Sequence, residues 1–431
     1  MREKARYSMI VFLCLCILVG CNDARPVKRD NQKDQGNASV DNGQNSSFSE
    51  SAYREKICKD RTNLKKYQEQ YQEDISQVQK NDFRKLSFDQ CVFAELPDSD
   101  SVSVLDPGER GVSVEESISI IKNWLVDIGQ EDIDLDKELR VVTSQLEWDD
   151  SQEPPYCYPS VMEHRGELTS GHGFFVNTNS CHALVLADGI CSMSDGTITR
   201  YLGEDGHAEA DAGGAYQEEI VAKGSFDEMA SQSYELLSGE ISVREAAEVV
   251  KRYFEAGTPF PPAKDVEIDI PYVSVFSLGD KYGYSFEMRR VYQNIPFAYA
   301  YSAEERRARS GSEDCMVAYV VNNQTVSAYH GFDAAQPFQV LVEESDILSL
   351  KDAMELLDSK LANELQAQIE YVGLAYCTIC LDEEKETYVV YPCWALDGLV
   401  ENNNRRIRIY MDVLTGDVYL YTQVQTEDAD E

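Results

Sequence analysis

Positive charge is scarce in this sequence. Its 431 residues include 39 Lys and Arg against 77 Asp and Glu, which gives a formal net charge of −38. A field of that sign repels phosphate backbones and anionic lipid surfaces, which disfavours nucleic-acid binding and polybasic membrane docking. The acidic excess attracts cations and basic partners, or simply keeps a solvated surface soluble. Hydrophobic residues make up 43% of the chain, which is enough for real cores and excludes wholesale disorder.

Motifs that carry catalysis are also missing. The sequence has no G-x-S-x-G, H-E-x-x-H, Walker or dinucleotide-binding glycine motif. Its acidic pairs, such as Asp149-Asp150 and Glu304-Glu305, could act as acid and base only where a cleft shifts their pKa values. At this density of carboxylates, the proximity of two acids means little. We therefore predict no catalytic residue and no cofactor.

Histidine is rare, with five residues in the chain. A zinc site needs three or four converging His, Cys or carboxylate ligands. The best group lies in one short stretch and consists of His172, Cys181, His182 and Cys191. If that stretch is a strand, the adjacent Cys181 and His182 point to opposite faces. These four residues are weak metal candidates, and the alternative is buried cysteines beside surface histidines.

Two further patterns suggest a metal or redox site. Asp132, Asp134 and Asp136 alternate as on a strand and could bind calcium weakly, but the loop lacks the central Gly and terminal Glu of an EF-hand. Cys377 and Cys380 have the spacing of redox motifs. Thioredoxin-like sites place such a pair at a helix start, whereas a strand-like segment follows here. Because residues three apart on a strand face opposite sides, the thiols of Cys377 and Cys380 would not meet. We therefore expect neither a calcium site nor a redox site.

The N-terminus has the parts of an export signal. Three basic residues among the first six precede an uncharged apolar run at residues 9–20. This run is too short to span a bilayer but suits the core of a secretory signal. It ends in the letters LVGC at residues 18–21, which resemble the lipobox of bacterial lipoproteins. The resemblance implies that Cys21 is lipidated and anchors the chain to the membrane; the alternative is an ordinary signal peptide that ends in Cys.

The segment after Cys21 predicts a flexible tether. Residues 22–51 are rich in Asn, Asp, Gln, Ser and Lys and contain almost no large apolar residue, so they cannot offset their ordering entropy by burial. Of the twelve cysteines, nine remain after Cys21 and the two of the signal are set aside. An odd, scattered set does not indicate a disulfide framework, although one or two bridges stay open. In an exported protein, so many thiols indicate a reducing or anaerobic habitat.

Three segments share one helix-start pattern, in which Ser precedes an acidic residue by three positions. The pairs are Ser113 and Glu116, Ser242 and Glu245, and Ser349 and Asp352. This is the capping box or its Asp variant, which satisfies backbone N–H groups at a helix start. Behind each cap, apolar residues at i, i+4, i+7 and i+11 predict one stripe for packing on a sheet. The stripes are Val114, Ile118, Ile121 and Leu125; Val243, Ala247, Val250 and Phe254; and Leu350, Met354, Leu357 and Leu361.

Downstream of each helix the pattern changes to strands and closes with a turn. The turns lie at Asp188-Gly189, Asn322-Asn323 and Thr415-Gly416. The last hairpin is the clearest, because strict alternation precedes a Gly that supplies positive φ. The predicted fold class is therefore α+β: three related units, each a helix packed on an antiparallel sheet, after a signal peptide and flexible tether. The alternative is that common short motifs coincide.

These patterns predict the domain boundaries. The signal peptide occupies residues 1–20, the tether 21–52, a helical N-terminal segment 53–110, repeat 1 residues 111–202, an acidic loop and helix 203–240, repeat 2 residues 241–333, repeat 3 residues 334–425, and an acidic tail 426–431. Within them, residues 53–86 read as an amphipathic helix that packs on repeat 1 or associates with a partner. Residues 216–237 read as a further helix.

Two of these segments resemble a known family. The opening at residues 241–247 and the closing at residues 410–418 are similar to the two ends of PepSY-type domains, and residues 391–394 resemble the Pro-x-Trp before the final strand pair. The whole chain resembles clostridial cell-surface lipoproteins. The resemblance implies extracytoplasmic modules with one helix packed on an antiparallel sheet, and it supplies no catalytic residues.

The sequence predicts a function class. We expect a lipid-anchored lipoprotein on the outer face of the cytoplasmic membrane of a Gram-positive anaerobe, acting as a non-catalytic binding or regulatory module. Its partner would be an envelope protein or peptide, recognised for example at exposed strand edges by β-augmentation. The alternatives are a metal-assisted envelope hydrolase around residues 172–191 and a small-solute or peptide receptor.

Overall fold

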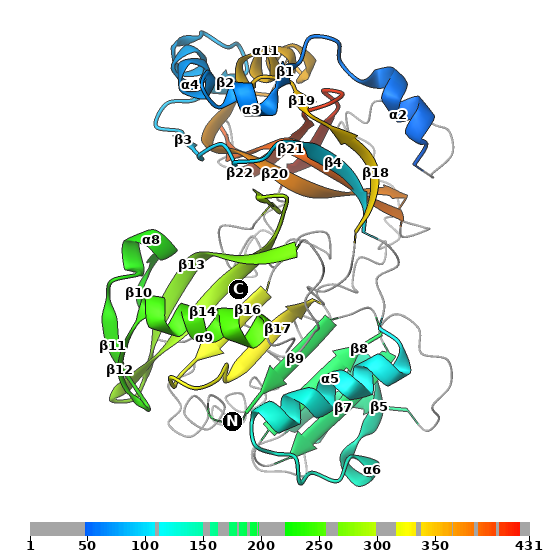
Figure 1. The fold of residues 1–431 in the computed structure, drawn as a ribbon, viewed down its shortest axis with the longest axis vertical. Coiled ribbons are helices and arrows are strands. Elements are labelled where there is room, and N and C mark those ends of the chain that lie inside the picture. The colour runs from blue at the N-terminus through cyan, green and yellow to red at the C-terminus, as the bar shows by residue number, and fades with distance from the viewer. Residues whose placement is uncertain are drawn as a thin grey trace, which may run out of the picture. The chain divides into compact units, whose positions relative to one another are not determined.

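The fold is mixed α+β, with more strands than helices. The computed structural model describes residues 48–107, 112–149, 156–162, 172–178, 181–187, 190–195, 197, 220–255, 266–298, 316–332, 338–363, 365–382, 387–401 and 405–422. The chain divides into two compact bodies, which are coloured by residue number in Figure 1. The central body comprises Glu109–Arg290 and Tyr299–Gln336, and the terminal body comprises Pro26–Gly108, Val291–Ala298 and Pro337–Glu431. Repeat 1 and most of repeat 2 fall in the central body, residues 291–298 of repeat 2 belong to the terminal body, and repeat 3 falls in the terminal body from residue 337 onward.

Repeat 1 begins with helix α5 (Val114–Asp127), whose predicted capping box is confirmed. The Ser113 hydroxyl accepts from the Glu116 N–H at 3.2 Å, and the Glu116 carboxylate accepts from the Ser113 N–H at 2.8 Å. The helix contacts strands β7 (His172–Thr178) and β8 (Cys181–Leu186). These strands form an antiparallel meander in the order β5 (Arg140–Asp149), β7, β8 and β9 (Ile190–Ser194). Strand β6 (Tyr156–Val161) pairs with the outer edge of β5.

The predicted stripe of α5 is only half right. Ile121 and Leu125 are buried, but Val114 is 37% exposed and Ile118 is half-buried. The buried face also contains Ser117, Ile120 and Trp124. Trp124 determines this face, since its large ring meets Tyr253 of the other central helix edge to face, with 6.2 Å between the centroids. The predicted stripe, counted at i, i+4, i+7 and i+11 from Val114, is therefore rotated relative to the face of α5 that is buried.

Repeat 2 has the same order of elements. Helix α9 (Val243–Glu255) begins at the Ser242 capping box, and all four residues of its predicted stripe are buried. It precedes the meander β13 (Val266–Leu278), β14 (Lys281–Tyr292), β16 (Met316–Val320) and β17 (Ala328–Phe332). The predicted turn at Asn322-Asn323 joins β16 to β17. The turn predicted at Asp188-Gly189 lies outside the described residues.

The helix predicted at residues 216–237 is wrong. Its described part forms strand β10 (Ile220–Ser225), the short helix α8 (Phe226–Met229) and strand β11 (Ser233–Leu236), which pairs with β12 (Gly239–Ser242). Strand β10 pairs antiparallel with β13, about fifty residues further along the chain. Tertiary pairing of this kind overrides local helix propensity, and the Gly239 φ of 119° fixes the end of the β11–β12 turn.

The last strands of repeats 1 and 2 pair with each other. Strands β9 and β17 run antiparallel, with Ile190 opposite Phe332 and Ser194 opposite Ala328. This pairing joins the two meanders into one sheet in the order β10-β13-β14-β16-β17-β9-β8-β7-β5-β6. The two helices then share one core, to which both meanders contribute.

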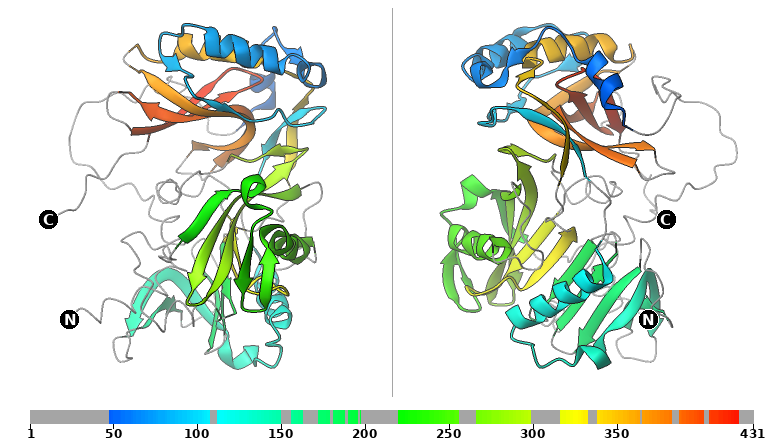
Figure 2. Two further views of the ribbon diagram at one scale, coloured as in Figure 1. Left: turned by 90° about the vertical axis from the view of Figure 1, so that its left-hand side faces the viewer. Right: turned by 45° about the vertical axis from the view of Figure 1, so that its right-hand side comes forward.

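Repeat 3 lies in the terminal body, where helices α11 and α4 cover one face of the sheet (Figure 2). Helix α11 (Leu350–Lys360) begins at Ser349, which accepts from the Asp352 N–H at 3.2 Å, and its predicted stripe is buried. The meander is β20 (Ala367–Asp382), β21 (Thr387–Val400), β22 (Arg405–Asp412) and β23 (Val418–Thr422). The predicted final hairpin is confirmed, with a φ of 70° at Gly416.

Several short elements complete the terminal body. Strand β18 (Gln339–Glu344) pairs with β4 (Val102–Asp106), and β4 meets β21. Strands β2 (Leu86–Ser87) and β3 (Val92–Phe93) run parallel to β20, and β15 (Ile295–Pro296) pairs back on β14. Strand β1 (Thr62–Asn63) pairs with β19 (Asp346–Ile347).

The single helix expected at residues 53–86 is replaced by three pieces. They are α2 (Glu50–Lys56), α3 (Leu64–Tyr67) and α4 (Tyr71–Lys80). Between α2 and α3 the chain is not helical: it bends at residues 59–60, the Cys58 N–H donates to the Leu414 carbonyl, and β1 pairs with β19. Helix α4 packs on α11 in the terminal body, whereas the expectation was packing on repeat 1. None of the described helices is both long and apolar enough to cross a membrane.

Candidate functional site

The four weak metal candidates do not converge. Cys181 and Cys191 are buried in the core beneath the central helices. His182 lies beside Ser194 in the ladder, and His172 begins β7 at the end opposite to the start of β8. Because neighbours on a strand alternate between faces, His182 points away from the face that Cys181 occupies. Within the described ranges, no group of three or more His, Cys, Asp or Glu could hold a metal ion.

The aspartates proposed for calcium are not on a strand. Asp134 precedes the short helix α6 (Leu135–Glu138), and its carboxylate pairs with Lys137 at 2.6 Å. Asp132 lies in a turn and Asp136 lies within α6, so the strand spacing on which the pattern rested is wrong. The side chain of Asp149 is not among those described, and Asp150, Glu304, Glu305 and the lipidation candidate Cys21 lie outside the described residues.

The pair Cys377 and Cys380 lies on strand β20, opposite Tyr391 and Tyr388 of β21. The Cys377 thiol hydrogen-bonds with Cys393, a residue of the next strand. Burial raises the pKa of the Cys393 thiol well above its ordinary value, and its hydrogen bond with Cys377 raises it further. A buried thiol with a raised pKa, such as that of Cys393, is a poor nucleophile, which argues against redox catalysis by this residue.

The final hairpin of repeat 3 contains a fully buried carboxylate. Asp412 ends β22 and accepts hydrogen bonds from the Leu414 N–H at 2.8 Å and from the Thr415 hydroxyl at 2.8 Å. The first of these bonds spans two residues, as in an Asx turn, which explains locally why Asp stands at the start of this turn. Asp412 also donates its N–H to the Asp417 carbonyl at 2.9 Å. The turn is thus held by both the backbone and the side chain.

A third donor to Asp412 comes from the other end of the chain. The Tyr53 hydroxyl donates to the carboxylate at 2.7 Å, across 359 positions of sequence. Burial raises the pKa of Asp412 from 3.8 to about 6, although all three donors lower it. The desolvation of the charged form is therefore larger than the gain from three hydrogen bonds. Burial, followed by the charge of Asp412, also raises the pKa of Tyr53.

Aromatic rings enclose this carboxylate. Tyr53 stacks on Tyr391 with 5.7 Å between the centroids, and Tyr391 stacks on Tyr419 at the same distance. Phe48, which precedes α2, packs against the Tyr53 ring. Burial raises the pKa values of Tyr391 and Tyr419, so these phenols stay protonated. The rings supply the low-dielectric surroundings that make the Asp412 charge costly.

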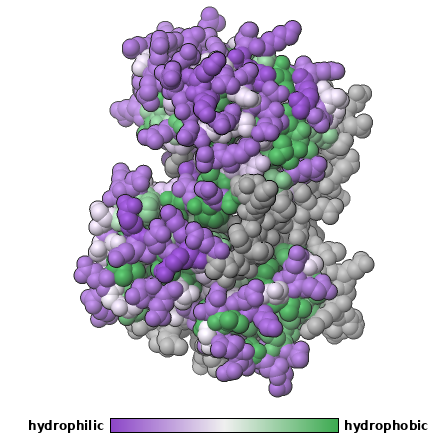
Figure 3. All heavy atoms as spheres, in the orientation of Figure 1, coloured by the Kyte–Doolittle hydropathy of each residue, from purple (hydrophilic) through white to green (hydrophobic). Residues whose placement is uncertain are grey.

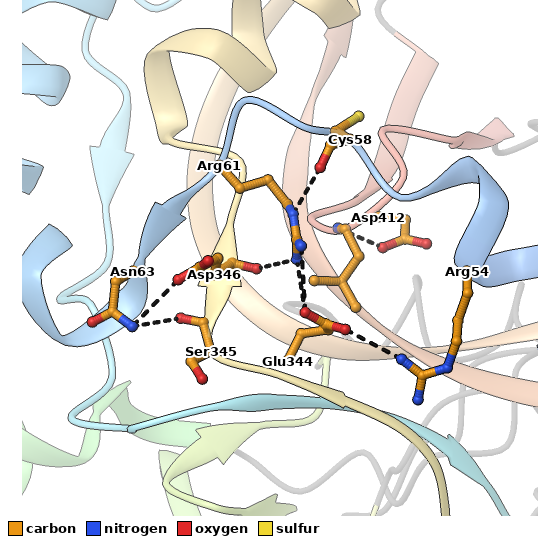
Figure 4. Close-up of polar contacts among 9 residues, drawn as sticks. Arg54, Cys58, Arg61, Asn63, Glu344, Ser345, Asp346 and Asp412 are labelled. Atoms are coloured by element: carbon orange, nitrogen blue, oxygen red, sulfur yellow. Dashed lines mark hydrogen bonds and ion pairs between the residues drawn. The ribbon is translucent and has the colours of Figure 1, made fainter.

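Residues 48–63, which we call the strap, hydrogen-bond to repeat 3 at several points between Tyr53 and Asn63, some of which are drawn in Figure 4. The Arg61 guanidinium donates to the Cys58 carbonyl and the Asp346 carbonyl, each at 2.8 Å. Arg61 and Arg54 both approach the Glu344 carboxylate, each at 3.3 Å. The Cys58 N–H donates to the Leu414 carbonyl at 2.9 Å, directly beside the Asp412 turn. The strap ends in β1, which pairs with β19.

The chain after the strap is also fixed to repeat 3. The Tyr67 hydroxyl accepts from the Leu350 N–H at 2.6 Å, at the start of α11, and donates to Asp74 at 2.7 Å. Tyr71 lies flat on Trp394 of β21, with 6.0 Å between ring centroids. The Trp394 ring N–H donates to the Leu348 carbonyl at 3.0 Å. The N-terminal segment is therefore part of the fold of the terminal body.

A second buried charge lies on the same sheet face as Asp412. Asp397 and Arg408 are cross-strand neighbours on β21 and β22, and their side chains form an ion pair with both partners less than 10% exposed. The Arg408 guanidinium also contacts the Tyr410 hydroxyl at 3.3 Å. Buried pairs of this kind add little net stability, but they strongly disfavour arrangements that break them.

The sequence pattern contains the residues of this site but does not indicate that they meet. Asp412 belongs to the family-like segment at residues 410–418, and Tyr53 is only the first residue of the helix expected at residues 53–86. The local signal was the spacing of Asp412 to Thr415 and Gly416, which is typical of an Asx turn. Because the groups of this site are buried and bond to one another, they suit fastening the strap better than turning over a substrate.

The chain was compared with known proteins. No family model matches it, and no curated protein matches it. Among solved structures it is similar to the Bacillus megaterium YpeB C-terminal domain, with a TM-score of 0.27 and 10% sequence identity. That similarity covers 73% of this chain and 100% of the YpeB domain.

Proposed function

We propose that this protein is a lipid-anchored extracytoplasmic lipoprotein that acts as a non-catalytic binding or regulatory module at the cell envelope. It would stand on the outer face of the cytoplasmic membrane of a Gram-positive anaerobe and bind an envelope protein or peptide. The observation that carries the proposal is the continuity from LVGC at residues 18–21, through a polar tether, to the strap. An anchor at Cys21 would hold the body through a segment that hydrogen bonds fasten to repeat 3.

We also infer that the body consists of three copies of one PepSY-like unit. Each copy has a Ser-capped helix followed by a four-stranded antiparallel meander. In repeat 2 the Tyr284 hydroxyl donates to the Ile241 carbonyl at 2.6 Å, and in repeat 3 the Trp394 ring donates to Leu348. Both carbonyls belong to the residue before the capping Ser, and both aromatic residues lie on the second strand of the meander. A shared framework contact of this kind supports common descent of the repeats.

A further backbone contact supports the same correspondence. In repeat 1 the Val112 N–H donates to the Ala187 carbonyl, and in repeat 3 the Leu348 N–H donates to the Val413 carbonyl, both at 2.8 Å. Each donor directly precedes the capping Ser, and each acceptor lies at the final turn of its repeat. In repeat 2 the inserted β11–β12 hairpin takes this place, and Leu237 donates to Val321 at 3.0 Å.

The surface is suited to a solvated location. On the face drawn in Figure 3, hydrophilic residues predominate on the described surface of each body, and hydrophobic residues form smaller areas among them. The net charge of −38 would repel anionic lipid and wall polymers, which favours a body held away from the membrane surface. That charge also favours partners with basic surfaces.

Replacement of Cys21 tests the anchor. We expect Cys21→Ser to abolish labelling by fatty acid and to release the protein from membranes in cell fractionation. Cys16→Ser is the matched control, because it changes a thiol of the same N-terminal segment and should leave labelling and fractionation unchanged. Retention of Cys21→Ser in the membrane without label would contradict the anchor.

Two further measurements test the binding role. Crosslinking in intact cells should join the protein to a specific envelope component, and the same component should be captured by the detergent-solubilised full chain. Metal analysis of the purified protein addresses the hydrolase alternative. Stoichiometric zinc that is lost in His172→Ala would overturn the non-catalytic proposal.

A further inference from the structure

Strand β23, at residues 418–422, has one paired and one open edge. Its inner edge pairs with β22, and no other strand in the described part of the chain hydrogen-bonds to it. Backbone bonding alternates along an antiparallel ladder. Because Asp412 donates to Asp417, the register places the bonded pairs at Tyr419 and Tyr421. Val418, Leu420 and Thr422 therefore direct their N–H and C=O groups outward.

This edge lacks the features that normally protect an edge strand. Natural edges are blunted by charges, Pro or bulges. The five residues of β23 read Val-Tyr-Leu-Tyr-Thr, without a charge or a Pro, and their register to β22 has no bulge. The Leu420 side chain is 42% exposed. In a chain with 77 acidic residues, an uncharged β-prone edge indicates a surface that is used.

The chain itself shows what the corresponding edges do. Strand β23 is the last strand of the repeat 3 meander, as β9 and β17 are the last strands of repeats 1 and 2. In the central body these two strands pair antiparallel over five residues each, edge to edge. Among the strands that the structure describes, none plays this part for repeat 3. The surface that matches the open edge of β23 is then the same edge of another molecule.

We propose that two copies of this chain pair antiparallel through the outer edges of β23. Antiparallel self-pairing has a two-fold axis, so every contact is made twice. Leu420 then lies opposite Leu420 of the second copy, with Tyr419 opposite Tyr421 and Val418 opposite Thr422. The proposal rests on the correspondence of the three repeats, and it requires neither the lipid anchor nor an envelope partner.

Crosslinking at the two-fold axis tests the geometry. The proposed pair at position 420 exchanges backbone hydrogen bonds, so its Cα atoms lie about 5.5 Å apart, within reach of a disulfide. We expect the detergent-solubilised full chain with Leu420→Cys to form a disulfide dimer under mild oxidation. Ile220→Cys is the control, because it lies on the edge strand β10 and is similarly exposed, at 43%. Equal dimer formation by both variants, or none by Leu420→Cys, overturns the proposal.

Proline at the same position tests the backbone pairing. Leu420→Pro removes an outward N–H but no bond to β22, as edge strands tolerate. In analytical ultracentrifugation, we expect the wild-type chain to dimerise with rising concentration and Leu420→Pro to sediment as a monomer. Leu420→Lys should give the same result, and near-ultraviolet circular dichroism shows that each variant is folded. A wild-type monomer at all concentrations, or a dimer that both variants retain, contradicts the pairing.

Discussion

The final turns of repeats 2 and 3 are built alike but covered differently. Asn322 accepts from the Gln324 N–H at 2.8 Å, and Asp412 accepts from the Leu414 N–H at 2.8 Å. Both are Asx turns that span two residues. Asn322 is half-buried and neutral, and its other bonds are local. Asp412 is fully buried, and the strap lies on it through Tyr53.

This difference shows how an Asx turn can also bind a segment from a distant part of the sequence. A neutral amide is sufficient to close the hairpin, so the carboxylate at 412 is not needed for the turn itself. Its charge makes the hydrogen bond from Tyr53 stronger, because bonds to ionised acceptors exceed those between neutral groups. The same charge is costly to bury. The stability of repeat 3 should therefore depend on the strap and on pH, and that of repeat 2 should depend on neither.

The largest expected effect tests whether the two repeats share a framework. Trp394→Ala removes a fully buried ring and should destabilise the terminal body by about 4 kcal/mol. Tyr284→Ala is the matched change in the central body. Hydrogen exchange followed by mass spectrometry reports each body separately through its own peptides. If each variant loosens its own body, the proposed correspondence between Tyr284 and Trp394 is supported. If Trp394→Ala has no larger effect than a surface substitution, that correspondence is contradicted.

The second prediction concerns pH. Because the pKa of Asp412 in the folded chain is about 6 instead of 3.8, the folded state binds more protons than the unfolded state between these values. The stability that Asp412 contributes is thus fully present below pH 3.8 and is lost as pH rises through about 6. At 1.36 kcal/mol per pKa unit, the loss is about 3 kcal/mol.

Asp412→Asn isolates this contribution. Its amide keeps the oxygen that accepts from Leu414, as Asn322 does, and removes the charge. In hydrogen exchange of terminal-body peptides, we expect the variant to gain stability relative to the wild type as pH rises from 4 to 7. Asn322→Asp should show no matching pH dependence in the central body. An unchanged difference between Asp412→Asn and wild type across this range would show that the carboxylate titrates normally.

Short-range features were predictable from the sequence, and this site was not. The capping boxes at Ser113, Ser242 and Ser349 involve residues three positions apart, so the pattern contains both partners. The final hairpin is also local. By contrast, the strand that replaces the helix expected at residues 216–237 is decided by pairing with β13, and Tyr53 meets Asp412 across 359 positions. The periodicity of neighbouring residues contains no information about a contact between residues so far apart in the sequence.

The third prediction concerns the hydrogen bond from Tyr53 to Asp412, which can be removed while the charge of Asp412 is kept. Tyr53→Phe keeps the ring on Tyr391 but deletes the hydroxyl that donates to Asp412, which leaves a buried carboxylate with two donors instead of three. We expect a loss of about 2 kcal/mol in the terminal body and a further rise in the pKa of Asp412. Tyr234→Phe is the control, since that hydroxyl bonds to Gln232 at an exposed position. Equal small effects of both changes would mean that the strap is not held by this bond.

The smallest expected effect distinguishes the two arginines of the strap. The Arg61 side chain is 14% exposed and donates to two carbonyls as well as to Glu344. Arg54 is 45% exposed, and its partner Glu50 is more exposed still. A lysine cannot reproduce the planar fork of a guanidinium, so Arg61→Lys should destabilise the strap by about 1 kcal/mol.

Arg54→Lys should change the exchange of strap peptides too little to measure, because solvent screens an exposed pair. The comparison of the two variants by hydrogen exchange at residues 48–63 therefore separates fixed geometry from charge alone. If Arg54→Lys loosened the strap as much as Arg61→Lys, the shared attraction to Glu344 would be what holds it, and the carbonyl contacts of Arg61 would not. Raising the salt concentration should then weaken the strap of the wild-type chain, whereas carbonyl contacts in a half-buried setting would resist salt.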